Sequence, residues 1–380
     1  MADRLPTIVG FAGALVVLAV LVWFVGVDDI LASLAQADVS VLAAVVGVAL
    51  VWLALWGMAL KTVLESLGAP VPAHTAILVF AAAVFSNNVT PFGQAGGEPV
   101  SALLISQAAD TEYETGLAAI ASVDTLHFVP SIGFAIGAFT FVAAGAVQLG
   151  RNLLFAAGAI VTLAVALPVG AYLGWRYRYE LEAAVVRAVT PIARRLGRLI
   201  PRWSAPTKAA IERRIEGFFT SIDRVAGDRK ALVVATGFSA LGWLALGTAL
   251  WLALFSLGYT VPFSAVMLAI PVGMVAGIAP LPGGSGAIET VLVLLLVPTA
   301  GIPSAVATSA VLLYIGGGIA AGPAVVAVLL ASGSSIAVKA GLTLSGPRPF
   351  ARKVALWSGL LLLVTTVATI AAVLSEGGLA

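Results

Sequence analysis

The chain has 380 residues, of which 61% are hydrophobic and only 10% are charged, and its mean hydropathy is +1.08. A soluble domain cannot bury so much apolar surface, so the composition predicts a polytopic membrane protein and excludes the soluble classes. The absence of cysteine excludes disulfides, thiol nucleophiles and cysteine metal sites. The two histidines, His74 and His127, are far apart, so we expect no metal and no cofactor.

Apolar segments long enough to cross a bilayer, about 20 residues, recur along the chain. They are 7–27, 40–61, 115–147, 152–175, 231–256, 303–331 and 354–374. The first is too long for the apolar part of a signal peptide and lacks a cleavage site, so we interpret it as the first span. Two more apolar regions, 73–109 and 262–299, are interrupted near the middle by proline and glycine. Each is either two crossings or one re-entrant hairpin of two half-helices.

The chain repeats itself after about 190 residues. The block Trp52-Leu53-Ala54-Leu55 returns as Trp243-Leu244-Ala245-Leu246, and Ser66-Leu67-Gly68 returns as Ser256-Leu257-Gly258. Each copy ends in a break rich in proline and glycine, with a glutamate seven residues after a proline. Chance similarity between apolar segments is the alternative, but the shared order and nearly constant spacing of the blocks favour duplication. A duplicated apolar unit with a broken helix and a buried acid is typical of a transporter site.

Positive charge orients the chain, because basic residues collect on the cytoplasmic side. Segment 176–230 carries 13 of the 20 basic residues against six acids. When this loop and the N-terminus are cytoplasmic and both interrupted regions begin and end on one side, only Arg151 falls outside. Span 40–61 then runs inward and span 231–256 outward, so the two copies are inverted. We predict a multi-pass protein of the plasma membrane.

These observations predict one all-α membrane domain over 1–380, a polytopic helical bundle with an inverted repeat and two interrupted, re-entrant helical hairpins. The first repeat covers 40–147, the second covers 231–331, and 354–374 is the last span. The basic loop 176–230 contains an amphipathic stretch from Ile211 to Val225 with apolar residues at helical spacing. It either binds anionic lipid headgroups or only anchors the topology. Nucleic-acid binding is not needed to explain its charge.

The first break is the most polar stretch at membrane depth. Pro91 ends or kinks the preceding helix, and Pro99 fits the first turn of a new helix over 99–109. Unpaired N–H groups at a helix start attract anions such as phosphate. Glu98 either caps that helix or acts as a protonatable group in a transport path. The candidate residues here are Asn87, Asn88, Thr90, Pro91, Gly93, Gln94, Gly96, Gly97 and Glu98.

The second break and the flanking spans contribute further candidates. Glu289 lies in the first turn of the following helix, as a cap or as a site residue. Asp124 and His127 are three residues apart on one helical face and either join two spans or form a relay for protons or headgroups. Tyr314 is a polar ring at similar depth in the second half. The candidates in the second break are Pro282, Gly283, Gly284, Gly286 and Glu289.

Both motifs point to a known family. Segment 87–100 (Asn-Asn-Val-Thr-Pro-Phe-Gly-Gln-Ala-Gly-Gly-Glu-Pro-Val) and segment 280–289 (Pro-Leu-Pro-Gly-Gly-Ser-Gly-Ala-Ile-Glu) resemble the signature segments of the flippase-like integral membrane family. That family includes the transmembrane region of lysylphosphatidylglycerol synthase/flippase proteins and stand-alone relatives. The resemblance covers the chain from the first span to about residue 374. It implies a protein that moves or handles a lipid across the bilayer.

The chain departs from the family pattern in two places. The family often has an arginine in the span after the first motif and a Tyr-Arg pair in the span after the second. The matching stretches here contain Asp124 to His127 and Tyr314-Ile315-Gly316. Arginine is the natural partner of phosphate, so the missing arginines give no support for recognition of a phosphate headgroup. No large soluble aminoacyl-transferase domain is present, which gives no support for lysyl transfer.

The leading hypothesis is a lipid transporter that moves a polar lipid or a polyprenyl-phosphate carrier, and not an enzyme. The alternatives are an integral membrane enzyme acting on a lipid headgroup and a scaffold for a lipid-modifying partner. An enzyme would need a nucleophile or a metal set, which the sequence does not offer. A transporter of an ion or of a small apolar compound is also open, because an inverted repeat does not specify the cargo. The sequence leaves the oligomeric state undefined.

Overall fold

The computed structural model describes residues 5–89, 93–145, 208–278 and 284–316, together with isolated positions between 158 and 187. Every regular element in these ranges is helical, so the predicted all-α class is confirmed. The predicted span 354–374 and most of 152–175 lie outside the described residues, as does 303–331 beyond residue 316. The helices are α1 (Leu5–Val25), α2 (Val27–Leu34), α3 (Val39–Ser66), α4 (Ala73–Val89), α5 (Gly93–Ala108), α6 (Tyr113–Gly145), α9 (Lys208–Gly227), α10 (Arg229–Ser256), α11 (Phe263–Val275), η2 (Ala276–Ile278), α12 (Ala287–Ala300) and α13 (Ser304–Gly316).

Three of the described helices, α3, α6 and α10, are long and apolar enough to cross a membrane, and the bent pair α1–α2 is a fourth candidate. The chain bends by 85° between α1 and α2, at Gly26. The φ of Gly26 is 104°, a value that glycine adopts readily and other residues rarely do. Helix α1 therefore ends at Val25, two residues before the end of the predicted span 7–27. The interrupted regions form the hairpins α4–α5 and α11–α12, with η2 following α11.

Helices α3 and α10 begin and end in the same way. Each has 28 residues and begins after an aspartate whose carboxylate accepts a backbone N–H, from Ser40 for Asp38 and from Ala231 for Asp228. Each ends two residues before a glycine in the left-handed region, Gly68 and Gly258. The sequence repeat thus extends to the local signals that start and stop a helix.

The two equivalent helices pack against each other in opposite directions. The Asp38 N–H at the start of α3 donates to the Ser256 carbonyl at the end of α10, at 2.8 Å. At the other end, Arg224, just before α10, donates to the Leu67 carbonyl just after α3, at 3.0 Å. The α3–α10 pair is therefore antiparallel. At each end of the pair, a hydrogen bond connects the start of one helix to the end of the other.

Packing between each long helix and the hairpin that follows it is also repeated. A methyl group at Gly57 of α3 would lie 2.6 Å from Cα of Ile77 in α4. A methyl group at Gly247 of α10 would collide with the Met267 sulfur in α11. Both members of the second contact lie 190 positions after their counterparts in the first. Small residues allow close approach of apolar helices in both copies.

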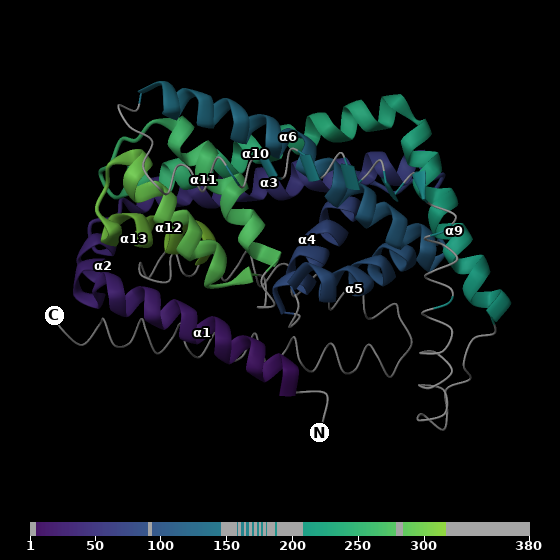
Figure 1. The fold of residues 1–380 in the computed structure, drawn as a ribbon, viewed down its shortest axis with the longest axis horizontal. Helices are drawn as coiled ribbons and strands as arrows, with labels where there is room; N and C mark the ends of the chain where they lie inside the picture. Colours follow the sequence, from purple (N-terminus) through teal and green to yellow (C-terminus); the bar gives the residue numbers. More distant parts are fainter. Residues whose placement is uncertain are drawn as a thin grey trace.

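The hairpins occupy neighbouring positions beneath the long helices. In Figure 1, α4–α5 and α11–α12 lie on the same side of α3, α6 and α10, and α9 stands at the end of the molecule away from α12 and α13. Helix α6 packs against α5, α10 and α11, and η2 contacts α5. The break of the second hairpin therefore touches the helix that follows the break of the first.

Candidate functional site

The helix after the first break begins earlier than the sequence predicts. Helix α5 starts at Gly93, so the predicted start at Pro99 is wrong. Pro99 lies inside the helix, where it removes a single N–H bond, the one that would reach the Ala95 carbonyl in the first turn. Thr90 and Pro91 lie outside the described residues, and only the backbone is described for Asn88, Gly93, Gln94 and Gly96.

The two arms of the first hairpin touch at Gly97. A methyl group at this position would overlap the Asn87 amide oxygen and would lie 2.7 Å from the Asn87 backbone nitrogen and Cα. Only a glycine permits this approach of α5 to the end of α4. The contact places the Asn87 amide beside the first two turns of α5.

Glu98 is half-buried and is the sixth residue of α5. A carboxylate six residues into a helix is too far along to bond the amide that precedes the helix, which a capping glutamate at the third position does. No hydrogen bond or ion pair joins Glu98 to another described residue. Its predicted role as a cap of the new helix is therefore excluded by geometry.

Two polar side chains hold the helix around Glu98. The buried Ser101 hydroxyl donates to the Gly97 carbonyl at 3.0 Å. The Tyr113 hydroxyl, at the start of α6, donates to the Pro99 carbonyl at 3.3 Å. Neither residue is singled out by the sequence, because a lone serine inside a helix or a lone tyrosine at a helix start carries no distinctive pattern. Together they fix the backbone on both sides of Glu98.

The second break uses its glutamate differently. The buried Glu289 carboxylate accepts the Gly286 N–H at 2.6 Å, and so it caps α12 from the third position of the helix. Gly284 and Gly286 have φ of 69° and 87°. A methyl group at Gly284 would lie 2.6 Å from Cα of Gly277. Pro282 and Gly283 lie outside the described residues.

His127 lies at the crossing of three long helices. Its Nδ1 is 2.7 Å from the Ser239 hydroxyl of α10, and its ring stacks on Trp56 of α3 with centroids 3.8 Å apart. The Trp243 indole donates to the His127 carbonyl at 2.8 Å. Asp124 is half-buried on the same helix, one turn away. The arrangement joins spans and does not place His127 beside Glu98 in any described contact.

Tyr314 is half-buried on α13, which packs against α10, α12 and α2. The structure thus distributes the predicted residues over four places. Asn87, Gly97 and Glu98 lie together at the first break. Gly284, Gly286 and Glu289 form the second break, while His127 and Tyr314 lie on other helices.

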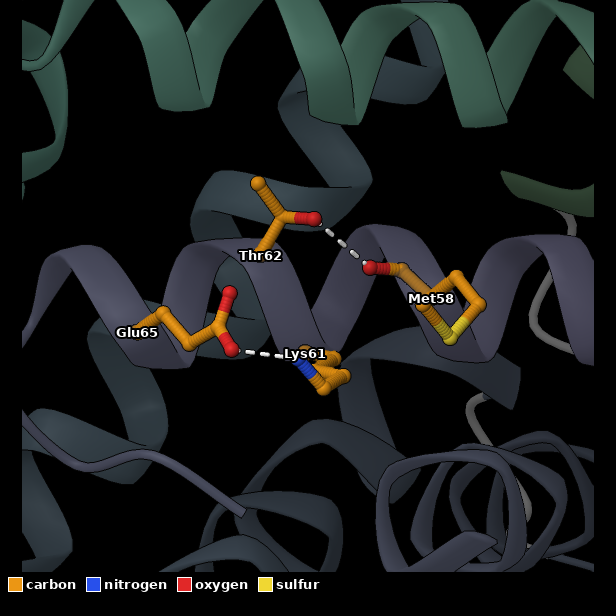
Figure 2. Close-up of polar contacts among 4 residues, drawn as sticks. All are labelled: Met58, Lys61, Thr62 and Glu65. Atoms are coloured by element: carbon orange, nitrogen blue, oxygen red, sulfur yellow. Dashed lines mark hydrogen bonds and ion pairs between the residues drawn. The ribbon is translucent and has the colours of Figure 1, made fainter. Parts of the chain in front are cut away.

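The charged end of α3 lies near the basic helix α9. Figure 2 shows Lys61 paired with Glu65 one turn later, and the Thr62 hydroxyl donating to the Met58 carbonyl at 2.9 Å. Helix α9 packs against α6, α10 and α3, with Ile211 and Val225 buried. Arg214 of α9 reaches Glu114 of α6 at 3.1 Å. Part of the apolar stripe of the predicted amphipathic stretch is therefore covered by protein.

Comparison with known proteins shows the family of the chain. The family model described as the lysylphosphatidylglycerol synthase TM region matches residues 8–316. The chain belongs to the lysylphosphatidylglycerol synthase TM region family. Within this family, it is 26% identical to a UPF0104 membrane protein of Methanothermobacter thermautotrophicus over 77% of this chain and 83% of the relative. It is 24% identical to a UPF0104 membrane protein of Pyrococcus horikoshii over 77% and 87% of the two chains. No solved structure matches the chain.

Proposed function

We propose that this membrane protein translocates a polar lipid, or a polyprenyl-phosphate carrier, across the bilayer without changing it chemically. The observation that carries the proposal is Glu98, a half-buried carboxylate that bonds no described residue, on the helix that η2 contacts. Placing a charged acid in a bilayer costs about 2.5–3.5 kcal/mol on insertion scales, so such groups generally mark a transport path. Membership in a family named for a lipid synthase supports a lipid as the cargo.

The antiparallel α3–α10 pair supports an inverted repeat. Two equivalent helices that cross the same bilayer in opposite directions carry their hairpins into it from opposite faces. A cysteine placed at Ser285 tests this topology, because the native chain has no cysteine. We expect an impermeant thiol reagent to label Ser285→Cys from outside. Labelling only from the cytoplasm would refute the inversion.

The two helix starts do not offer the same binding chemistry. The Glu289 carboxylate already occupies the first turn of α12, and its negative charge would repel a phosphate there. The start of α5 carries no glutamate within its first five residues, so its N–H groups are the better phosphate site. Glu98, one turn further on, would bind a proton when the headgroup leaves and release it when the path reopens to water. This sequence would couple lipid movement to protonation.

Anionic headgroups are the proposed partner of α9. Arg213 and Arg214 of α9 are exposed, as are Arg229 and Lys230 at the start of α10. They lie at the end of the bundle where α3 finishes and α6 begins, the level expected for headgroups. Acidic residues among them lower the net charge of the helix, so this attraction is modest.

A reconstituted assay tests the proposed function. Protein is placed in vesicles containing phosphatidylglycerol labelled with a fluorophore on its acyl chain, and an impermeant quencher reports which leaflet holds the probe. We expect Glu98→Gln to slow translocation at least tenfold. Glu289→Gln is the matched control, since glutamine still accepts a bond from Gly286, and it should retain the rate within about twofold.

Several results would overturn the proposal. Equal rates in the wild type and Glu98→Gln would remove Glu98 from the mechanism. No translocation of either labelled phosphatidylglycerol or labelled polyprenyl phosphate by the wild type would refute lipid transport. Mass spectrometry of the recovered lipid gives a separate readout, because a chemically altered headgroup would identify an enzyme.

A further inference from the structure

A group of four buried side chains joins α3, α6 and α10. This crossing cluster consists of Trp56, His127, Ser239 and Trp243. Besides the bonds of His127 described above, the Trp56 indole donates to the Ser239 carbonyl at 3.2 Å. The Trp56 and Trp243 rings meet edge to face with centroids 5.7 Å apart. Three indole or imidazole groups thus bond across helices at one point.

The crossing cluster lies at the midpoint of the repeat. In an antiparallel pair of equivalent helices, corresponding residues come close only near the axis that exchanges the two helices. Trp52 and Trp243 are corresponding residues of the repeated Trp-Leu-Ala-Leu block. Trp56 contacts both rings, with centroids 5.3 Å from Trp52 and 5.7 Å from Trp243. The axis that relates the two copies therefore passes through this region.

The cluster fits the α10 backbone closely. A side chain at Gly242 would overlap the Trp56 indole nitrogen, so Trp56 lies directly against the α10 backbone at that point. Such a contact tolerates only a small change in the crossing of α3 and α10 before atoms collide or hydrogen bonds break. Packed interfaces of this kind have discrete arrangements and do not deform continuously.

Two polar atoms of this region have no hydrogen-bond partner among the described residues. They are the buried Nε2 of His127 and the buried indole nitrogen of Trp52. Buried polar groups are nearly always bonded, so each exception calls for an explanation. A second arrangement of α3 and α10, in which these atoms find partners, would account for both.

We propose that the crossing cluster locks the relative orientation of the two repeats, and that His127 is its positioning residue. This inference rests on the proposed transport function, in which the two hairpins move relative to each other. His127 belongs to the first copy, bonds the second copy through Ser239 and Trp243, and stacks on Trp56. Loosening these bonds frees the repeats to exchange between orientations without touching Glu98.

Paired spin labels on the full-length protein in vesicles measure this exchange. Cysteines at Gln107 of α5 and Leu294 of α12, both exposed, report the separation of the two hairpins. In the wild type, one distance between the two labels should predominate. We expect Trp243→Phe to raise the population of the other label-to-label distances about fivefold, because the variant loses one buried hydrogen bond. Ser239→Ala, which removes the hydroxyl facing His127, should act in the same direction.

Trp251→Phe is the matched control. The Trp251 indole donates to the Val261 carbonyl at 3.0 Å, a bond of the same type that lies within the second copy. This variant should leave the separations unchanged, which distinguishes repeat orientation from general loss of a tryptophan bond. Wild-type separations in both Trp243→Phe and Ser239→Ala would overturn the proposal, as would equal broadening in Trp251→Phe.

The measurement is independent of transport. Should wild-type vesicles translocate no lipid while Trp243→Phe still broadens the separations, the crossing cluster stands and the proposed function fails. Should Glu98→Gln stop transport while the cluster variants leave the separations unchanged, the function stands and the lock fails.

Discussion

The two hairpins carry the same glutamate at corresponding positions of the repeat, but the helices that hold them start at different points. Helix α12 begins two residues before Glu289, so this carboxylate bonds the amide of Gly286 and completes the helix start. Helix α5 begins five residues before Glu98, so the acid lies more than one turn inside. A shift of the helix start by three residues separates a carboxylate that caps its helix from one that bonds no described residue.

The contact between the two helices of each hairpin also differs between the copies. The first copy presses Gly97 against Asn87, and the second sets Ile288 against Gly277 in the corresponding place. The first copy thus keeps an amide beside its acid, whereas the second fills the space with an apolar side chain. The contact between the two helices of the hairpin is thus polar in the first copy and apolar in the second.

The largest expected difference between the copies comes from adding one methyl group. Gly97→Ala would force the two arms of the first hairpin apart, because the new carbon meets the Asn87 backbone at 2.7 Å. We expect a loss of about 2–3 kcal/mol in the free energy of unfolding, the upper range for overpacking. Gly277→Ala meets the Ile288 side chain at 3.4 Å, an ordinary contact.

Thermal unfolding in detergent measures both changes. Gly277→Ala should be neutral or stabilising by less than about 1 kcal/mol, because alanine restricts the unfolded chain. Gly133→Ala, with nothing within 4 Å, serves as a second control on α6. Equal losses of stability in Gly97→Ala and Gly277→Ala would show that the two hairpins are packed equally tightly.

A smaller difference is expected when each glutamate is truncated. Glu289→Ala leaves the Gly286 amide without its acceptor in a buried place and should lower the free energy of unfolding by about 1–2 kcal/mol. Glu98→Ala removes no described bond and should change it by less than about 0.5 kcal/mol. Chemical unfolding of the two variants side by side checks this order, and a reversed order would mean that Glu98 has a structural role.

The smallest difference concerns the cap of α3. Hydrogen bonds from the Ser40 side chain and backbone hold the pKa of Asp38 below its usual value. The stabilisation from this carboxylate is therefore complete above the ordinary aspartate pKa and is lost as the pH falls through the lower folded value. Asparagine also caps helices but does not titrate.

Unfolding of the wild type and Asp38→Asn across a pH series measures this effect. The wild type should lose its advantage over Asp38→Asn as the medium is acidified, and above neutral pH the difference should be constant. A difference that does not change with pH would show that the Asp38 charge contributes nothing to the cap.

Sequence patterns predicted the long helices well, because apolar length and terminal signals act locally. Span 40–61 appears as α3, span 231–256 as α10, and both interrupted regions appear as hairpins. The predicted start of α5 at Pro99 is wrong because a proline near the start of a helix removes only one hydrogen bond. Pro99 can therefore lie in the second turn, and its position does not mark the first residue of the helix. The crossing cluster was not predicted, since Trp56 and Ser239 are 183 residues apart and nothing in the local pattern links them.

The attachment of α9 has a mechanical consequence. Near the end of α3, Arg224 holds the Leu67 carbonyl and Arg214 holds Glu114, so the segment between the copies straps this end of the bundle. At the opposite end of the α3–α10 pair, the Asp38 N–H donates to the Ser256 carbonyl. Side chains of α9 therefore fasten one end of the pair, and we expect any relative movement of the two copies to be larger at the Asp38 end.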